Sequence, residues 1–380
     1  MQKNSAGFMK TILGLVVAVL VIWGLVSLSD GGSKGPIKIG FIGSLTGDAA
    51  AYGEPARNIT AMAVEEINKA GGVNGRMIEV IYEDGKCNGK DATNAAQKLV
   101  NVDKVQVIIG GFCSSESLAA VPVAEGAKVA LISPGSSSPD LTGKSSYFVR
   151  NYPADTAQGK VLAEAANSKG WKKVAFLQEQ TDYALGVFKA FSSRFVELGG
   201  VVIKEEFPTA TSDFRSMIVK LKAEKPDALF IDTQTPAVAE KALKQFQESK
   251  WKVQLLVNDV VPGNPSTVTQ YAKVLEGALT AEFGVDPTNA KFTAMLADYK
   301  AKYGAEPPYQ SYAQTEYDAV YLVRDALLAS GDNGEKIAAW FRTVKDWEGA
   351  SGKITIQADG DRSGGHRLET IKDGKVEVVD

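Results

Sequence analysis

The sequence predicts an α/β protein with two doubly wound, parallel-sheet lobes, and two observations carry this prediction. From residue 37 onwards, short apolar runs rich in β-branched residues alternate with amphipathic helical patterns, which is typical of βαβ units and a parallel sheet. The alternation restarts near residue 156 as a second series of similar length. Because 380 residues can hold one large domain or two ordinary ones, the restart favours two lobes.

The first 36 residues are typical of a transmembrane or signal helix followed by a tether. Lys3 and Lys10 precede an uncharged apolar run over residues 11–28, about 25 Å long as a helix. The run is long for a signal peptide, its exit is a poor cleavage site, and no cysteine follows it for lipid attachment. We expect an uncleaved membrane anchor rather than a cleaved signal, and export of the remaining chain in either case.

In the first series, apolar runs bounded by glycine or polar turns predict strands, and amphipathic stretches between them predict helices. The expected strands cover residues 37–42, 77–83, 105–109, 129–132 and 147–150. The expected helices cover residues 58–70, 91–102 and 114–125, and residues 43–52 are expected to form a loop of small residues.

The second series follows the same rules. Its expected helices cover residues 156–168, 183–198, 213–223 and 237–248, and its strands cover 173–177, 201–206, 228–231 and 254–257. The remainder is expected to form helices over 290–303 and 312–328, a strand–turn–strand unit over 353–368, and a final hairpin over 369–379 that turns at Asp373 and Gly374. No Pro-rich linker separates the two series, so we expect short connections between the lobes.

Composition gives no sign of a catalytic or nucleic-acid-binding site. The chain is 44% hydrophobic and 23% charged, and its net charge of −3 gives no reason to expect nucleic acid as a partner. It has one histidine, His366, and no HExxH, GxSxG or GxxxxGK[ST] motif. We therefore expect no catalytic residue, no metal and no cofactor.

Small, hydroxyl-rich loops follow two consecutive strands of the first series. The strand at 105–109 ends at a Gly-Gly pair, after which Ser114 or Ser115 can cap a helix. The strand at 129–132 ends in the loop PGSSSP at 134–139. Ligands of open α/β sheets bind at the carboxyl ends of strands, where helix N-termini offer N–H groups to an anion. These loops are therefore a candidate ligand site, unless the serines only cap helices and turns.

The only two cysteines, Cys87 and Cys113, follow the second and third predicted strands. If those strand ends are neighbours in a parallel sheet, a disulfide is geometrically feasible, and export to an oxidising compartment agrees with it. The alternative of two buried free thiols stays open. A zinc site would need more ligands than two cysteines and a remote histidine.

Four segments carry a family resemblance. They read IGFIGSLTGDAAAYG at 39–53, IIGGFCSS at 108–115, ISPGSSSPDLT at 132–142 and ITIQADGDR…IKDGKV within 354–376. Together they resemble the type I periplasmic binding proteins, and most closely the leucine/isoleucine/valine-binding branch that serves ABC importers. The resemblance implies two lobes joined by three crossovers, with one ligand in the cleft between them. The expected division is 1–36 for the anchor and tether, 37–152 plus 283–368 for lobe 1, and 153–282 plus 369–380 for lobe 2.

The resemblance also implies roles for residues at matching positions. Ser114 and the helix that begins there would bind the ligand carboxylate. Gly135 would offer its carbonyl to the ligand ammonium, and Ser137 would offer its hydroxyl and N–H to the two charged groups. Ser136 belongs to the same ligand-binding loop, and Asp259 would face the ammonium from the second lobe. The residues lining the rest of the cleft would be Tyr52, Tyr183, Gln234 and Tyr312, and the family's disulfide falls at Cys87 and Cys113. The plain alternatives are half-buried packing for the tyrosines and a solvated turn for Asp259.

Two departures from the branch bear on the ligand. Gln234 stands where the branch often has an aromatic residue, so we expect a more polar side-chain pocket. Asp259 is short and follows Asn258, so a slip of one residue in the match would exchange their roles.

We predict a non-catalytic, extracytoplasmic solute-binding protein that closes on a branched-chain amino acid or a similar small zwitterion and delivers it to an ABC transporter permease. The alternatives are the ligand-sensing ectodomain of a signalling system, or a receptor for a neutral amide or another carboxylate. An enzyme is a distant third, because the first predicted turn lacks GxGxxG.

Overall fold

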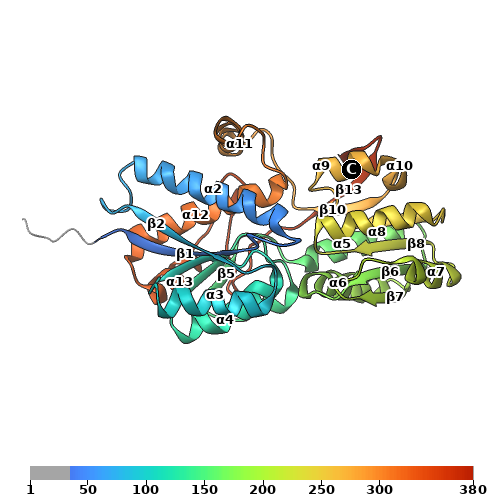
Figure 1. The fold of residues 1–380 in the computed structure, drawn as a ribbon, viewed down its shortest axis with the longest axis horizontal. Helices are drawn as coiled ribbons and strands as arrows, with labels where there is room; N and C mark the ends of the chain where they lie inside the picture. Colours follow the sequence, from blue (N-terminus) through green and yellow to red (C-terminus); the bar gives the residue numbers. More distant parts are fainter. Residues whose placement is uncertain (1–34, 380) are drawn as a thin grey trace, which may run out of the picture.

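The computed structural model describes residues 35–379, which form two α/β lobes side by side along the long axis (Figure 1). The first sheet has five parallel strands in the order β2-β1-β3-β4-β5. The second has the order β14-β13-β10-β9-β8-β6-β7, parallel from β10 to β7, with β13 and β14 antiparallel at one edge. The predicted α/β architecture with parallel-sheet lobes is confirmed. The predicted N-terminal helix lies outside the described residues, and within residues 35–379 no helix is both long and apolar enough to span a membrane.

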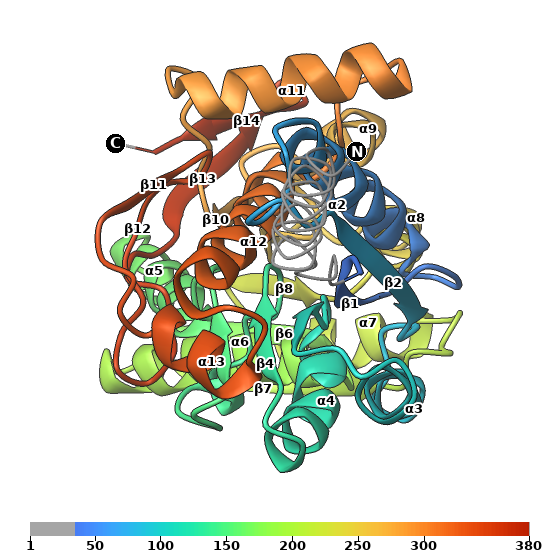
Figure 2. The ribbon, with the colours of Figure 1, turned by 90° about the vertical axis from the view of Figure 1, so that its left-hand side faces the viewer.

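Lobe 1 has helices on both faces of its sheet, as Figure 2 shows end-on. On β3, Val107 and Ile109 pack toward α2, α12 and α13, whereas Ile108 packs toward α3 and α4. Burial on both faces explains why these strands are continuous apolar runs rather than alternating ones. The elements are β1 (Ile37–Gly43), α2 (Ala50–Lys69), β2 (Ile78–Asp84), α3 (Gly89–Asn101), β3 (Val107–Gly110), α4 (Ser114–Gly126), β4 (Ala130–Ser133), β5 (Phe148–Arg150), α11 (Ala290–Tyr303), α12 (Gln310–Ser330), α13 (Gly334–Phe341), β11 (Trp347–Gly349) and β12 (Gly352–Ile354).

Lobe 2 is built around one continuous apolar core, in which the β6 and β8 strands and the phenylalanines beside them are fully buried. Helices α5 and α6 contact each other, as do α7 and α8. The elements are α5 (Asp155–Ser168), β6 (Lys173–Glu179), α6 (Asp182–Glu197), β7 (Val201–Phe207), α7 (Arg215–Ala223), β8 (Ala228–Asp232), α8 (Pro236–Glu248), β9 (Gln254–Val257), α9 (Pro265–Gln270), α10 (Ala272–Leu275), β10 (Leu279–Glu282), β13 (Arg367–Lys372) and β14 (Lys375–Val378).

The chain passes between the lobes after β5, after β10 and before β13. Buried arginines hold the first and third of these crossings together. The guanidinium of Arg150 donates to both carboxylate oxygens of Asp361, at 2.7 and 2.9 Å, and Arg362 Nη1 donates to the carbonyl of Asn151 at 3.0 Å. The hinge is therefore a cross-linked unit rather than a set of independent strands.

Helix α2 begins at Ala50, so the predicted loop over 43–52 is too long and Tyr52 lies in a helix. The small residues of this stretch had favoured a loop. The glycine is instead required by a close approach, because a Cβ at Gly53 would lie 2.0 Å from the carbonyl oxygen of Ser44. The glycine thus lets the first turn of α2 pack directly on the end of β1.

The predicted strand–turn–strand unit over 353–368 is wrong. Strand β12 pairs instead with β11, and the only other bridge in this stretch joins Ile356 and Arg362. Arg367 and Leu368 belong to β13, which pairs with β10 in the second sheet, so the expected lobe 1 boundary at 368 runs two residues too far. The final hairpin turns at Asp373 and Gly374 as predicted. The division into lobes otherwise stays a prediction.

Cys87 and Cys113 form a disulfide with a Cα–Cα distance of 5.2 Å. Their strands, β2 and β3, are not neighbours, because β1 lies between them. The bridge therefore spans the carboxyl end of β1, and the buried carboxylate of Glu116 accepts hydrogen bonds from the N–H groups of both cysteines at 2.9 Å. The disulfide and Glu116 together fix the loop from which α4 begins.

Replacing both cysteines by serine should lower the free energy of unfolding by about 3–4 kcal/mol, because the disulfide removes loop entropy from the unfolded chain. Urea unfolding of the oxidised parent, the reduced parent and the variant measures this. The reduced parent should match the variant, and thiol labelling of the unreduced, unfolded parent should find no free cysteine. Coincident transitions for all three samples would show that the bridge contributes nothing.

Candidate ligand-binding site

A small cavity of about 20 Å³ lies where the two lobes meet, roughly the volume of one water molecule. Lobe 1 and lobe 2 both contribute to its wall, so the lobes are closed on each other here. Its lining residues are Tyr52, Phe112, Cys113, Ser114, Gly135, Tyr183, Gln234, Val260 and Tyr312. The structure thus brings six of the predicted ligand-binding residues around one cavity.

On the lobe 1 side, Ser114 is oriented as a hydrogen-bond donor. It is the first residue of α4, and its Oγ accepts hydrogen bonds from the N–H groups of Ser137 at 3.3 Å and Ser138 at 3.1 Å. A hydroxyl oxygen has two lone pairs, so the hydrogen of Ser114 is left to donate. With the positive end of the α4 dipole beside it, this position suits a carboxylate.

Not every residue of the loop after β4 is available to a ligand, although the sequence match implies a role for Gly135, Ser136 and Ser137. The carbonyl of Gly135 accepts no hydrogen bond from residues 35–379 and lines the cavity. The N–H of Ser137 is already donated to Ser114. Ser136 does not line the cavity; its hydroxyl is bonded to Ser117 Oγ at 2.7 Å and to the Gly111 carbonyl at 2.8 Å. Ser136 therefore joins the two loops from behind.

On the lobe 2 side, Asp259 does not itself line the cavity; it is fully buried and is hydrogen-bonded to Tyr183 and Tyr312, which do. Its Oδ2 accepts hydrogen bonds from Tyr152 at 2.8 Å and Tyr312 at 2.9 Å, and its Oδ1 accepts one from Tyr183. Burial first, and then the Asp259 charge, raises the pKa of each of these tyrosines well above its usual value, so the hydroxyls stay protonated as donors.

Asp259 has no lysine, arginine or histidine within ion-pair distance in the described chain. A carboxylate offers about four acceptor positions, and three are used by the tyrosines. One position therefore remains for a ligand donor. The neighbouring Asn258 is held within lobe 2, because its side-chain amide donates to Asp232 Oδ1 at 2.9 Å and to the Thr233 carbonyl at 2.8 Å; it is uncharged, and its Oδ1 has no partner among the described residues.

Sequence reasoning missed Tyr152 and Asp155, which come from the first crossing and the start of α5. Asp155 is fully buried, and its carboxylate oxygens accept no hydrogen bond from residues 35–379. Burial, followed by Asp259, raises the pKa of Asp155 well above its usual value. No local pattern marks either residue, since only the fold brings the first crossing beside the loop after β9.

Gln234 connects the lobes around the cavity. Its carbonyl accepts a hydrogen bond from Tyr52 at 3.1 Å, its N–H donates to Glu179 Oε2 at 2.7 Å, and its side-chain amide contacts Cys87 Sγ. The amide oxygen of Gln234 has no hydrogen-bond partner among the described residues. The cavity is thus polar at this end, as the departure from the aromatic residue at this position predicts.

Residues 36–374 match the family described as periplasmic binding protein. The chain belongs to this family. A similar relative, the leucine-, isoleucine-, valine-, threonine- and alanine-binding protein of Pseudomonas aeruginosa, is 28% identical over 92% of both chains. Among solved structures, the branched-chain amino acid transporter substrate binding protein LivJ of Streptococcus pneumoniae in complex with isoleucine is 30% identical, with a TM-score of 0.80 over 90% of this chain and 99% of that one.

A further solved structure widens the range of ligands within the fold. The solute binding protein of an ABC transporter from Rhodopseudomonas palustris in complex with 3,4-dihydroxybenzoic acid is 28% identical, with a TM-score of 0.77 over 90% of this chain and 96% of that one. This chain therefore has the family and the fold of the extracytoplasmic substrate-binding proteins that serve ABC transporters.

Glu179 gives the closed cleft a pH dependence. Burial is the main cause that raises the pKa of its carboxyl to about 7; Asp48 adds to the shift, and the Gln234 N–H and Lys241 oppose it. An acid with a raised folded-state pKa binds its proton more tightly in the folded state. Its contribution to stability is therefore greatest below about pH 4.5 and falls as pH rises toward 7.

Glu179→Gln should remove the loss of stability that the parent shows as pH rises, because glutamine does not titrate. The variant keeps a side-chain oxygen as acceptor for the Gln234 N–H. The unfolding free energy of the variant relative to the parent should rise from pH 5 to pH 8, by at most about 3 kcal/mol. Urea unfolding at both pH values measures the difference. The exposed Glu248→Gln serves as the control and should show no such change. An identical pH dependence in Glu179→Gln and the parent would contradict the assignment.

Proposed function

We propose that this periplasmic binding protein captures an amino acid with an apolar side chain between its lobes and delivers it to an ABC importer permease. The observation that carries the proposal is Asp259, a buried carboxylate held by tyrosine hydroxyls without a cationic partner in the described chain. A buried charge is costly unless it is paired, so a ligand ammonium beside Asp259 would be strongly favoured.

The lobe 1 side of the cavity supports a zwitterion rather than a simple amine. The hydroxyl hydrogen of Ser114 and the N-terminus of α4 favour an anion, and the free carbonyl of Gly135 favours an ammonium. Lobe 1 thus offers donors to a carboxylate, while Asp259 of lobe 2 offers an acceptor to an amine. Only a ligand with both groups uses both walls, and closure then buries it with its charges paired.

Aromatic rings surround the rest of the cavity and support an apolar ligand side chain. Tyr52 stacks on Phe112 with ring centroids 5.3 Å apart, and Tyr312 packs edge-on to Phe112 at 5.1 Å. The Gln234 amide is the polar group at the margin. The relatives that bind leucine, isoleucine or valine support a branched-chain amino acid as the first ligand to test.

An aromatic carboxylate is the second candidate, favoured by these rings and by the similar structure that holds 3,4-dihydroxybenzoic acid. Such a ligand would satisfy Ser114 but would leave Asp259 facing a neutral group.

The predicted anchor at residues 11–28 would keep the protein at the membrane surface near its permease. A sensory ectodomain is the alternative use of the same closure.

Asp259→Ala should weaken binding of a zwitterionic amino acid by about two to three orders of magnitude, since losing one partner of a buried charge pair costs about 3–5 kcal/mol. Ser114→Ala should have a smaller effect, about 1.5–3 kcal/mol, because the backbone donors at α4 remain. Isothermal titration of the purified soluble part, after unfolding and refolding to remove co-purified ligand, measures both affinities.

The ligand panel for these titrations compares leucine and isoleucine with leucinamide, 4-methyl-2-oxopentanoate and 3,4-dihydroxybenzoate. The exposed Asp298→Ala is the matched control and should bind like the parent. If Asp259→Ala binds leucine as tightly as the parent, the zwitterion proposal fails. Preferential binding of the aromatic acid or of the amide would then identify which alternative ligand class holds.

A further inference from the structure

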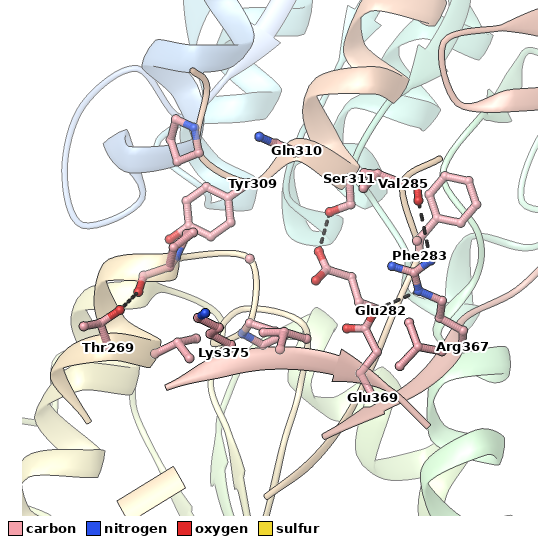
Figure 3. Close-up of a pocket in the computed structure, with 18 of the residues that line it drawn as sticks. Thr269, Glu282, Phe283, Val285, Tyr309, Gln310, Ser311, Arg367, Glu369 and Lys375 are labelled. Carbon is pink, nitrogen blue, oxygen red and sulfur yellow. Dashed lines mark hydrogen bonds and ion pairs between the residues drawn. The ribbon is translucent and has the colours of Figure 1, made fainter. Parts of the chain in front are cut away.

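A second, larger cavity of about 660 Å³ lies beside the hinge (Figure 3). Its walls are the second crossing at Glu282 to Val285, the start of α12 from lobe 1, and α9 with the β13–β14 hairpin from lobe 2. Its volume is in the range of small-molecule sites, and none of the residues predicted to bind the ligand lines it. It is therefore separate from the small cavity lined by Ser114, Tyr183 and Tyr312.

The lining is largely apolar, with acidic groups at its base. The rings and aliphatic side chains come from Pro262, Pro265, Val268, Phe283, Val285, Pro307, Pro308, Tyr309, Val376 and Val378. The two acidic groups at the base are Glu282 and Glu369 (Figure 3). Glu282 accepts a hydrogen bond from Ser311 Oγ at 2.5 Å. Glu369 is 3% exposed; its Oε1 accepts from Arg367, and its Oε2 has no partner among the described residues.

The two acids at the base, the buried Glu369 and the half-buried Glu282, outnumber the cations close to them. Arg367 is occupied, because its Nε donates to Glu369 at 2.7 Å and its guanidinium lies against Gly284. Lys375 and Asp373 lie at the hairpin turn, are exposed and have opposite signs. The two acids at the base therefore share one arginine. Burial raises the pKa of both carboxyls, and Arg367 opposes the shift.

We propose that this cavity is a second ligand site, for a small organic ammonium ion with an apolar body. The ammonium would bind between Glu282 and Glu369, where the free Oε2 of Glu369 supplies a charged acceptor. The apolar body would lie on the prolines, on Phe283 and on Tyr309, whose ring face also attracts a cation.

The site is connected to closure of the lobes. The N–H of Tyr309 donates to the Gly263 carbonyl of the opposite lobe at 3.0 Å, and the Tyr309 ring lies 4.7 Å from that of Tyr52 in the ligand cavity. Glu282 and Glu369 lie on lobe 2, whereas Tyr309 and the neighbouring prolines lie on lobe 1. A ligand whose ammonium binds the two acids and whose apolar body packs on Tyr309 therefore contacts both lobes and favours their closed arrangement. By linkage it should increase affinity for the ligand of the main cleft, and this coupling rests on the proposed function.

Isothermal titration with butylamine and phenethylamine tests the site directly in the ligand-free protein. Both amines should bind, and the uncharged butanol and 2-phenylethanol should bind at least about tenfold more weakly, because they lack the charged donor. Glu369→Gln should weaken amine binding by about tenfold or more. The matched control is Glu377→Gln, an exposed residue of the same hairpin that does not line the cavity, and it should bind like the parent.

Titration of leucine with and without saturating amine separates this site from the main cleft. Amine should strengthen leucine binding in the parent but not in Glu369→Gln. If amine instead competes with leucine, or binds the parent and Glu369→Gln equally, the second site is overturned. If leucine does not bind while the amine and alcohol results hold, the proposed cleft ligand fails and the second site stands. Equal binding of amines and alcohols to the parent overturns the site even if Glu369→Gln does not fold.

Discussion

The fully buried guanidinium of Arg150 connects the hinge to the ligand-binding loops. Arginine has five N–H donors, and here five acceptors meet them: both oxygens of Asp361, the carbonyls of Ser136 and Ser138, and the hydroxyl of Thr142. Breaking a buried charge pair costs about 3–5 kcal/mol, so the loop after β4 and the third crossing cannot easily separate. The Ser138 N–H in turn donates to Ser114 Oγ, so the start of α4 is also fixed relative to the hinge.

The two lobes have complementary chemistry in the cleft. Lobe 1 presents the amino end of α4 and a serine hydroxyl with its hydrogen free, whereas lobe 2 presents the carboxylate of Asp259. Three tyrosines hold this carboxylate: Tyr183 comes from lobe 2, Tyr312 from lobe 1 and Tyr152 from the first crossing. Closure therefore depends on the hydrogen bond from the lobe 1 hydroxyl of Tyr312 to the lobe 2 carboxylate of Asp259. A ligand ammonium would add a further hydrogen bond to Asp259 and would leave this one in place.

Buried acids are unusually frequent around the hinge. Asp155 and Asp232 are fully buried and Glu282 is half-buried, and burial raises the pKa of each carboxyl well above its usual value. Each also interacts electrostatically with Asp259. This concentration of carboxyl groups makes the inter-lobe region receptive to cations and unfavourable to a ligand with only negative charge.

The sequence by itself determined the repeating βαβ order, the two lobes and the strand ends at which Ser114 and Asp259 lie, because hydrophobic periodicity and turn residues are local properties. The disulfide pairing was feasible from the sequence, but the position of β1 between the bonded strands is a property of the assembled sheet. The start of α2 could not be predicted from the sequence either. Gly53 is needed for the close approach of α2 to the Ser44 carbonyl and does not mark a turn.

Only the tertiary structure decided which side chains meet. Tyr152 and Asp259 are 107 residues apart, Tyr183 and Asp259 are 76 apart, and Tyr52 and Gln234 are 182 apart. Such contacts depend on how two lobes built from discontinuous segments close on each other, and a single sequence carries no local signal for that geometry. The same reason explains why the pair Glu282 and Glu369 at the base of the larger cavity became visible only once the second crossing and the β13–β14 hairpin were in place.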